Sequence, residues 1–115
     1  TLEKIAVSFT IDVQDYFDEL VTTLFNQEYF SYEENAIEYV QKLVFYIEEN
    51  IDRLPHKKSP NSLLKYGDFY IFYQSNNRTT WYIFFSKKNK NYLIKHLTNN
   101  HIFEANFLNI LQSNE

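Results

Sequence analysis

The spacing of apolar residues changes its period at Pro55, and this change constrains the fold more than any other feature of the sequence. Before Pro55, apolar residues recur every three or four positions, which is the period of an amphipathic helix. After Pro60 they form short runs rich in aromatic and β-branched residues, which is the pattern of β-strands. Helices in one half and strands in the other predict an α+β domain in which helices pack on one sheet.

One strand and two helices are expected before Pro55. Residues 4–11 are short, β-branched and partly alternating, which predicts a strand. Asp12 follows and is expected to cap the first helix. Residues 31–34 have the S-x-x-E form of a capping box and predict the start of a second helix, which must end before Pro55. The predicted apolar stripes consist of Val13, Phe17, Leu20, Val21, Leu24 and Phe25 in the first helix and Ala36, Val40, Leu43, Val44, Ile47, Ile51 and Leu54 in the second.

Three strands are expected after a polar loop at residues 56–61. They cover residues 63–74, 79–86 and 92–97, and the segments between them have the lengths and residue types of hairpin turns. The centres of the first two strands are apolar on both faces, which indicates either strands covered on both sides or one face kept aromatic for a ligand. Residues 101–111 are expected to form a short terminal helix. The predicted order β-α-α-β-β-β-α describes one domain across all 115 residues, a helical hairpin packed on a mostly antiparallel β-sheet.

Acidic and basic residues are separated along the chain. Residues 1–52 contain 12 of the 15 acidic residues and only two lysines, a net charge of −10. Residues 53–115 contain nine basic and three acidic residues, a net charge of +6. A charge split of this kind within one domain indicates a two-sided molecule whose second half attracts anions. The alternative is that acidic side chains simply solvate the helices beside a sheet that carries lysines.

Composition excludes several classes of protein. The chain has no cysteine, which excludes disulfide frameworks, thiolate nucleophiles and thiolate metal sites. A single glycine, Gly67, excludes glycine-rich phosphate loops and dinucleotide-binding fingerprints. No apolar run approaches the ~20 residues that span a bilayer, and no signal-peptide pattern opens the sequence. We therefore expect a cytoplasmic domain that makes no contact with membranes.

Histidines and carboxylates do not form a recognisable metal or hydrolase pattern. The three histidines, His56, His96 and His101, are not spaced as ligand pairs on a helix, and no carboxylate cluster accompanies them. We therefore expect no metal and no cofactor, with the histidines at the surface or satisfied by local partners. Paired carboxylates for glycosidase chemistry stay open by residue type, but the acids lie on amphipathic helix faces, where solvation explains them.

Basic side chains are interleaved with aromatic ones in the strand-rich half. Cations neutralise phosphates and aromatic rings stack on bases, so this combination is typical of RNA binding. The alternative is that the lysine-rich turn at residues 87–91 is only a solvated turn and that the rings belong to the core. The basic set comprises Lys57, Lys58, Lys65, Arg78, Lys87, Lys88, Lys90 and Lys95, with His96 beside them on the last strand.

Four segments of the chain carry a family resemblance. They are the long helix that ends at Leu54, the stretch LKYGDFYIFYQ at 64–74, the stretch KKNKNY at 87–92 and the apolar strand WYIFF at 81–85. The second is similar to a basic, glycine-containing strand of the form R-x-x-G-x-Y-R-x-x-Y, and the third to a basic stretch that ends in tyrosine. The chain thereby resembles the RelE/ParE superfamily of bacterial type II toxins, which includes plasmid stabilisation proteins. The resemblance implies a toxin with a helical hairpin on an antiparallel sheet.

The resemblance also implies a metal-independent endoribonuclease that cleaves mRNA on the ribosome. In that branch of the family, basic residues hold the scissile phosphate, a base takes the proton of the ribose 2′-OH, and a cation stabilises the leaving oxygen. His96 is a candidate acid or base because histidine titrates near neutrality. The catalytic candidates are Lys65, Lys87, Lys88, Tyr92 and His96, and the RNA-binding candidates are Lys57, Lys58, Arg78, Lys90 and Lys95.

Departures from the family pattern leave other functions open. Tyr70 stands where the family usually has an arginine, and a tyrosine supplies no cation. Lys65 takes the place of an earlier basic residue but lacks the bidentate fork of arginine. The alternatives are a non-nuclease toxin that poisons DNA gyrase and a catalytically degenerate protein-interaction module of the same fold. For the toxins, the expected partners are a cognate antitoxin together with the ribosome and its mRNA, or DNA gyrase.

Overall fold

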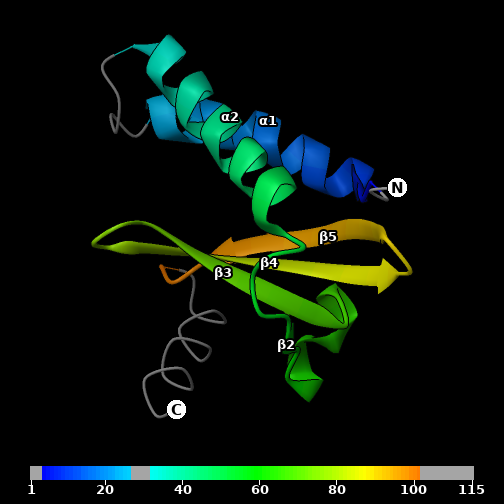
Figure 1. Ribbon diagram of the computed structural model, residues 1–115. Helices are drawn as coiled ribbons and strands as arrows, with labels where there is room; N and C mark the ends of the chain where they lie inside the picture. Colours follow the sequence, from blue (N-terminus) through cyan, green and yellow to red (C-terminus); the bar gives the residue numbers. More distant parts are fainter. Residues whose placement is uncertain (1–3, 27–31, 102–115) are drawn as a thin grey trace.

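The computed structural model describes residues 4–26 and 32–101. Figure 1 shows two layers, in which helices α1 (Ile11–Asn26) and α2 (Glu33–Asn50) lie together over one face of a β-sheet. The expected α+β architecture, two helices packed on a mostly antiparallel sheet, is confirmed. The terminal helix expected at 101–111 lies outside the described residues except for His101. None of the described helices is long and apolar enough to cross a membrane.

The sheet has five strands in the order β1-β5-β4-β3-β2. The strands are β1 (Ala6–Phe9), β2 (Lys57–Lys58), β3 (Phe69–Asn76), β4 (Thr79–Lys88) and β5 (Asn91–Asn99). The first strand lies parallel to β5, and every other pair is antiparallel. Two-residue turns join β3 to β4 and β4 to β5, so both predicted hairpins are confirmed.

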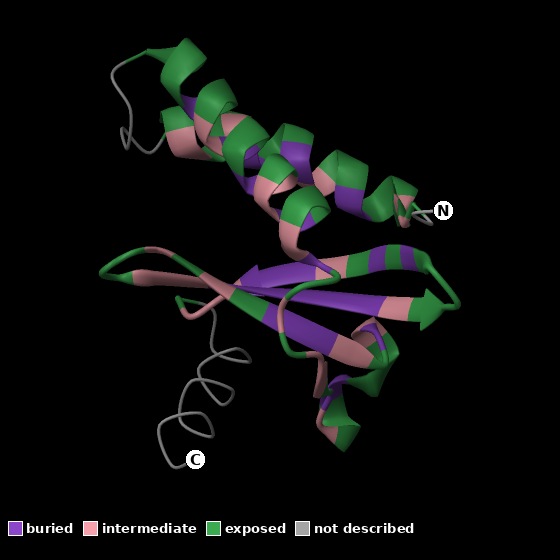
Figure 2. Cartoon of the chain, in the orientation of Figure 1, coloured by how far each residue is buried: buried purple, intermediate pink, exposed green. Residues whose placement is uncertain are grey.

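The main core fills the space between the helices and the sheet. Figure 2 shows the buried residues concentrated in the strands and on the sheet-facing sides of both helices. The predicted helical stripes supply the helix side of this core, because a 3.6-residue period places them on one side of each helix. Phe25 is the exception, since it is 39 % exposed. This core consists of Val13, Phe17, Leu20, Val40, Leu43, Ile47, Ile51, Ile71, Trp81, Ile83, Phe85, Tyr92, Ile94 and Leu97.

A second, smaller cluster lies on the face of the sheet opposite the helices, which we call the lower face. It consists of Leu63, Tyr70, Tyr82 and Phe84, with Tyr66 packed against it. Both Tyr82 and Phe84 have no exposed surface. The central strands are therefore covered on both sides at these positions, as their two-sided apolar sequence allowed.

Two predicted helix caps are wrong. The first helix begins at Ile11, two residues earlier than a cap at Asp12 predicts. Val13 donates its backbone N–H to Thr10 Oγ1 at 3.3 Å, so Thr10 and not Asp12 caps the helix. The N-cap of α2 is Tyr32, whose side chain makes no capping hydrogen bond. The predicted capping residue, Ser31, lies outside the described residues. The start of a helix is defined only to within one or two residues, because helix ends fray. The S-x-x-E pattern does not resolve the start more finely than that.

The strand predicted for residues 63–74 is wrong in its first part. Residues Asn61–Tyr66 form a 3₁₀-helix, η1, and the strand begins only at Phe69. Gly67 links the two, and a Cβ atom at this position would lie 2.7 Å from the backbone nitrogen of Phe85. The chain can approach β4 this closely only without a side chain. The predicted polar loop at 56–61 also contains the short strand β2.

Candidate nucleic-acid interface

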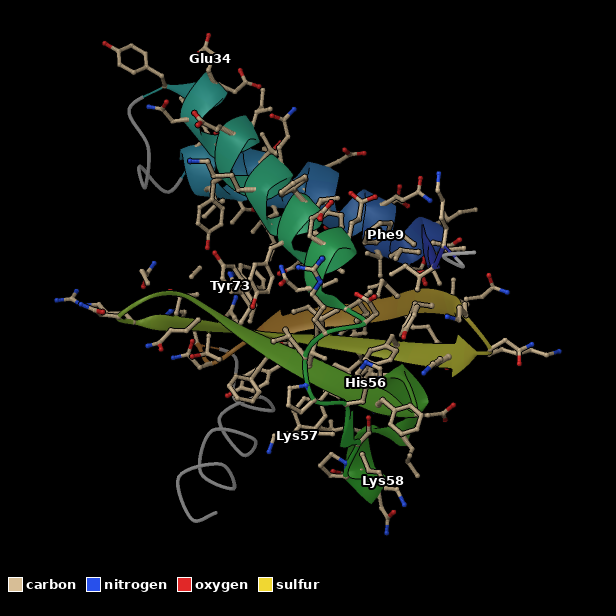
Figure 3. All side chains as sticks on the ribbon, in the orientation of Figure 1. Phe9, Glu34, His56, Lys57, Lys58 and Tyr73 are labelled. Atoms are coloured by element: carbon tan, nitrogen blue, oxygen red, sulfur yellow. The ribbon has the colours of Figure 1, made fainter. Side chains whose placement is uncertain are left out.

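Six lysines from separate segments gather at one end of the sheet, which we call the basic end. Lys57 pairs with Tyr70 near the start of β3, and Phe69 pairs with Phe85 near the end of β4. The close packing of Gly67 against β4 holds η1 at the same end. Figure 3 shows Lys57 and Lys58 on the segment that descends from α2 past the sheet. The basic end consists of Lys57, Lys58, Lys65, Lys87, Lys88 and Lys90.

The helical layer carries the opposite charge. Helices α1 and α2 contain nine acidic residues and one lysine, Lys42, which pairs with Glu38 at 3.3 Å. Between β2 and β5 the chain contains eight basic residues and a single acid, Asp68. The charge split along the sequence is therefore also a split in space. A polyanion is attracted to the basic end and repelled by the helices.

Lys65, Tyr66 and His96 meet on the lower face. The rings of Tyr66 and His96 stack with their centroids 4.0 Å apart and an angle of 13° between their planes. Lys65 Nζ lies 5.1 Å from the centroid of the Tyr66 ring. Because η1 folds back toward the sheet, two predicted catalytic residues, Lys65 and His96, both contact the ring of Tyr66. The sequence analysis did not single out Tyr66, since nothing in the local pattern distinguishes it from the other tyrosines.

Lys87 and Tyr92 lie on the opposite, helix-covered face. Tyr92 belongs to the main core and is only 4 % exposed. The two residues are paired across β4 and β5, and Lys87 Nζ lies 5.4 Å from the centroid of the Tyr92 ring. The five predicted catalytic residues are thus divided between the two faces of the sheet. Lys65 and His96 share the lower face, whereas Lys87 and Tyr92 do not reach them.

A β-bulge in β5 is the reason for this division. Phe84 pairs with His96 but its neighbour Phe85 pairs with Ile94, so Lys95 is an extra residue without a pairing partner in β4. In a regular strand, Tyr92, Ile94 and His96 would all point to one face. The bulge reverses the alternation after Ile94 and turns His96 to the lower face. No feature of the sequence predicts this bulge.

A shallow groove of about 260 Å³ crosses strands β1, β5 and β4 beside the basic end. Ser8, Leu93 and Ser86 lie side by side across β1, β5 and β4. Leu93 is 40 % exposed, and Ser86 donates a hydrogen bond to Asp68 Oδ2 at 3.4 Å. The groove is lined by Ser8, Ser86, Lys87, Lys88, Asn91, Tyr92 and Leu93. An open apolar floor with lysines at its rim suits a stacked base and its phosphate better than an enclosed ligand.

A further aromatic and basic pair lies on β2 and β3. Lys57 Nζ is 5.9 Å from the centroid of the Phe72 ring, which is 41 % exposed. By contrast, Tyr70 is only 5 % exposed and packs against Phe84 with ring centroids 5.5 Å apart. The position at which the resembled family has an arginine is therefore part of the packing here and supplies no cation.

Two predicted RNA-binding residues lie apart from the basic end. Arg78 occupies the β3–β4 turn at the other end of the sheet. Lys95 lines a hollow of about 370 Å³ between α1 and β5, together with Asp12, Asp15 and Glu19. Carboxylates beside an ammonium reduce its attraction for phosphate. Of the five RNA-binding candidates, the structure brings Lys57, Lys58 and Lys90 to the basic end.

His56 and His101 have hydrogen-bond partners within the fold. His56 Nε2 donates to the carbonyl oxygen of Ile51 at 2.6 Å, just beyond the end of α2. His101 Nε2 lies 3.1 Å from Thr79 Oγ1. The interpretation of these histidines as locally satisfied is confirmed. Within residues 4–26 and 32–101, no three metal-ligating side chains gather into a group that could hold an ion.

Burial raises the pKa of a phenol on each face of the sheet. The pKa of Tyr82 on the lower face rises to about 12, chiefly by desolvation and secondarily by the charge of Tyr70. The pKa of Tyr16, a residue of α1 that packs against the main core, also rises to about 12, by desolvation and then by Tyr39. Both phenols stay protonated at neutral pH, so neither can take a proton from a ribose hydroxyl.

Comparisons with protein-family models, with curated proteins and with solved structures find no match to this chain. The resemblance to RelE/ParE toxins therefore stays a prediction from the sequence.

Proposed function

We propose that the chain is the toxin component of a type II toxin–antitoxin system and that it binds single-stranded mRNA at the basic end and lower face. The observation that carries the proposal is the meeting of Lys65, Tyr66 and His96 beside the other lysines. Lysines supply the phosphate attraction, and exposed rings such as Phe72 supply stacking. The acidic helices keep the strand on one side of the molecule.

In the proposed reaction, cleavage needs no metal. His96 takes the proton of a ribose 2′-OH, and the 2′-oxygen attacks the adjacent phosphorus. The bond from phosphorus to the 5′-oxygen then breaks and leaves a 2′,3′-cyclic phosphate, while the 5′-oxygen takes a proton from water. Lys65 contacts the same Tyr66 ring as His96, and in the proposed reaction its ammonium neutralises the charge that develops on the phosphate. Stacking on Tyr66 fixes the plane of the imidazole.

A second candidate is RNA or protein binding without cleavage. The position of Tyr92 favours it, because this predicted catalytic residue is buried under the helices, where its ring cannot reach a phosphate. The buried Tyr70 at the family's arginine position favours it as well. A toxin that acts on DNA gyrase needs no general base and is a third outcome of the same experiment.

The test is inducible expression in a bacterial host, with growth and mRNA integrity followed by primer extension. The proposal predicts growth arrest with mRNA cut at discrete, codon-phased positions. The cuts should weaken by about 10²–10⁴-fold in the variant His96→Ala, the usual contribution of a positioned proton-transfer group. Lys42→Ala, in the helical layer, is the matched control and should cleave as the parent does.

Other results separate the candidates. Arrest with intact mRNA and altered DNA supercoiling assigns the chain to gyrase. Folded protein that binds RNA and causes neither arrest nor cleavage supports the binding module. Cleavage that survives in His96→Ala would contradict the proposed base.

A further inference from the structure

Little of residues 4–26 and 32–101 covers the outer edge of β3. The neighbouring strand β2 has only two residues, which pair with Phe69 and Tyr70. Beyond Tyr70, no strand within the described ranges 4–26 and 32–101 pairs with this side of β3. Figure 1 shows β3 extending well past β2 toward its turn with β4. Residues 71–76 therefore present an open sheet edge.

The hydrogen-bonding groups on this edge can be assigned from the register. Ser59 donates its backbone N–H to the carbonyl oxygen of Asp68, so the backbone groups of Asp68 point outward from the sheet toward β2. Backbone groups alternate in direction along a strand, so those of Tyr70, Phe72 and Gln74 also point outward. The groups of Tyr70 face β2. Phe72 and Gln74 are left with two N–H donors and two carbonyl acceptors for an added strand.

This edge has little of the usual protection of an exposed strand. Edge strands are normally blunted by charged residues, proline or bulges; residues 71–76 contain no charge and no proline, and the one bulge, at Ser75, lies at the end of the stretch next to the turn. The strand is also held firmly from above, because Tyr73 stacks on Tyr46 of α2 with ring centroids 3.8 Å apart. A rigid, uncharged edge of about the length of a typical strand is a preformed template for another strand.

We propose that this edge binds an extended acidic peptide segment of another protein, which adds to the sheet beside β3. Basic side chains stand at both ends of the open stretch. Lys57 Nζ lies over the Phe72 ring at one end, and Arg78 lies in the turn at the other. A segment with carboxylates near its two ends therefore meets a cation at each. This inference does not depend on RNA binding.

A second copy of this chain fits the edge less well. If β3 paired antiparallel with β3 of another copy, Lys57 of one copy would come beside Arg78 of the other. Like charges in such an interface cost binding energy. An acidic peptide reverses the sign of this interaction, so charge selects the peptide over self-association.

The experiment titrates ¹⁵N-labelled full chain with a capped synthetic peptide of about seven residues that alternates valine with glutamate. The proposal predicts chemical-shift changes centred on the amides of Phe72 and Gln74. A peptide that alternates valine with lysine is the charge control and should bind at least about tenfold more weakly. Two further peptides carry N-methyl groups on every second amide, one on the odd-numbered and the other on the even-numbered amides. One of them should bind about tenfold more weakly and the other should bind as the parent peptide does, because only one set of amides faces β3.

A matched pair of variants tests the edge from the side of the protein. Gln74→Pro removes an outward N–H and should abolish the shifts, whereas Gln74→Ala keeps the N–H and should bind as the parent does. Shift changes centred away from β3, equal binding of the lysine peptide, or no response at millimolar peptide would overturn the proposal. Sedimentation of the parent as a dimer that Gln74→Pro dissolves would assign the edge to a second copy instead.

Discussion

Gly67 determines how closely η1 approaches the sheet. Its Cα lies so near β4 that an added Cβ would meet Phe85 N at 2.7 Å and Phe85 O at 3.0 Å. Both contacts are with backbone, which cannot move aside without breaking the β3–β4 ladder. This one residue therefore also controls where Lys65 and Tyr66 stand relative to His96.

Gly67→Ala is expected to lower the free energy of unfolding by about 1–3 kcal/mol, the usual cost of forcing extra atoms into a packed site. Urea denaturation should give a lower midpoint with an unchanged slope. Ser62→Ala, at an exposed position of η1, is the control and should leave the midpoint in place. An unchanged midpoint in Gly67→Ala would show that η1 can move away from β4.

Tyr16 is expected to make stability fall above pH 10. Burial raises its pKa to about 12 in the folded chain from 10.0. Between these values the unfolded chain loses the proton first, so unfolding becomes more favourable as the pH rises. The contribution of protonated Tyr16 to the free energy of unfolding is complete below pH 10 and is lost as the pH rises toward 12.

The variant Tyr16→Phe should make this alkaline loss of stability shallower between pH 10 and 12. Thermal unfolding followed across that range measures it. Tyr32→Phe, at a residue that is 67 % exposed, is the control and should follow the parent curve. If stability falls equally with pH in the parent and in Tyr16→Phe, Tyr16 is not the cause of the alkaline loss of stability.

At the scale of whole elements, β5 shows how one extra residue changes a surface. Before the bulge, Tyr92 and Ile94 belong to the core, and after it Leu97 does. Because Lys95 is an extra residue, the core residues before the bulge and Leu97 after it all face the helices, while His96 points to the lower face. The sequence of β5 looks like one continuous strand, but the positions whose side chains face the core shift by one residue at the bulge.

Deletion of Lys95 is expected to be tolerated. Ile94 and His96 would then pair with Phe85 and Phe84 in a regular ladder, and each side chain would keep its present face. We expect a change in unfolding free energy below about 1 kcal/mol. Deletion of Leu93, in the regular part of β5, is the contrasting variant and should cost more than about 3 kcal/mol because it moves core side chains to the wrong face. Equal losses in chemical denaturation would contradict the role assigned to the bulge.

At the scale of the molecule, the fold sorts charge into two layers. The helices carry nine acids and the basic end carries six lysines, although the net charge of the chain is only −4. The separation arises because the acidic helices pack as one unit on one face and because three lysine-bearing segments end at the same side of the sheet. A weakly acidic protein can therefore present a strongly basic surface.

The proposed RNA binding should depend steeply on salt. If six lysines each neutralise one phosphate of a single strand, the logarithm of the binding constant falls against the logarithm of salt with a slope of about −4. Removing two of them in the double variant Lys88→Ala/Lys90→Ala should reduce the slope to about −3. Fluorescence anisotropy with a labelled oligouridine measures both, and Lys42→Ala should keep the parent slope. An equal slope in the double variant would place the RNA elsewhere.

The sequence by itself determined the kind and order of the main elements, but not the short strand β2 or the 3₁₀-helix η1. Hydrophobic period, proline and turn residues are local signals, and they correctly predicted both helices, both hairpins and the helix-on-sheet architecture. The same local signals failed where a boundary depends on the neighbouring chain, as at Thr10 and at η1. They also placed the basic residues in the correct half of the molecule.

Only the tertiary structure decided which of these residues share a surface. Tyr92 and His96 are four positions apart and would share a face of any regular strand, but the bulge between them separates them. Lys65 and His96 are far apart in sequence and meet through Tyr66 because η1 folds onto the lower face. The open edge of β3 likewise exists only because β2 ends after two residues. Bulges, folded-back turns and uncovered edges arise from pairing between distant segments, and a local pattern carries no record of that pairing.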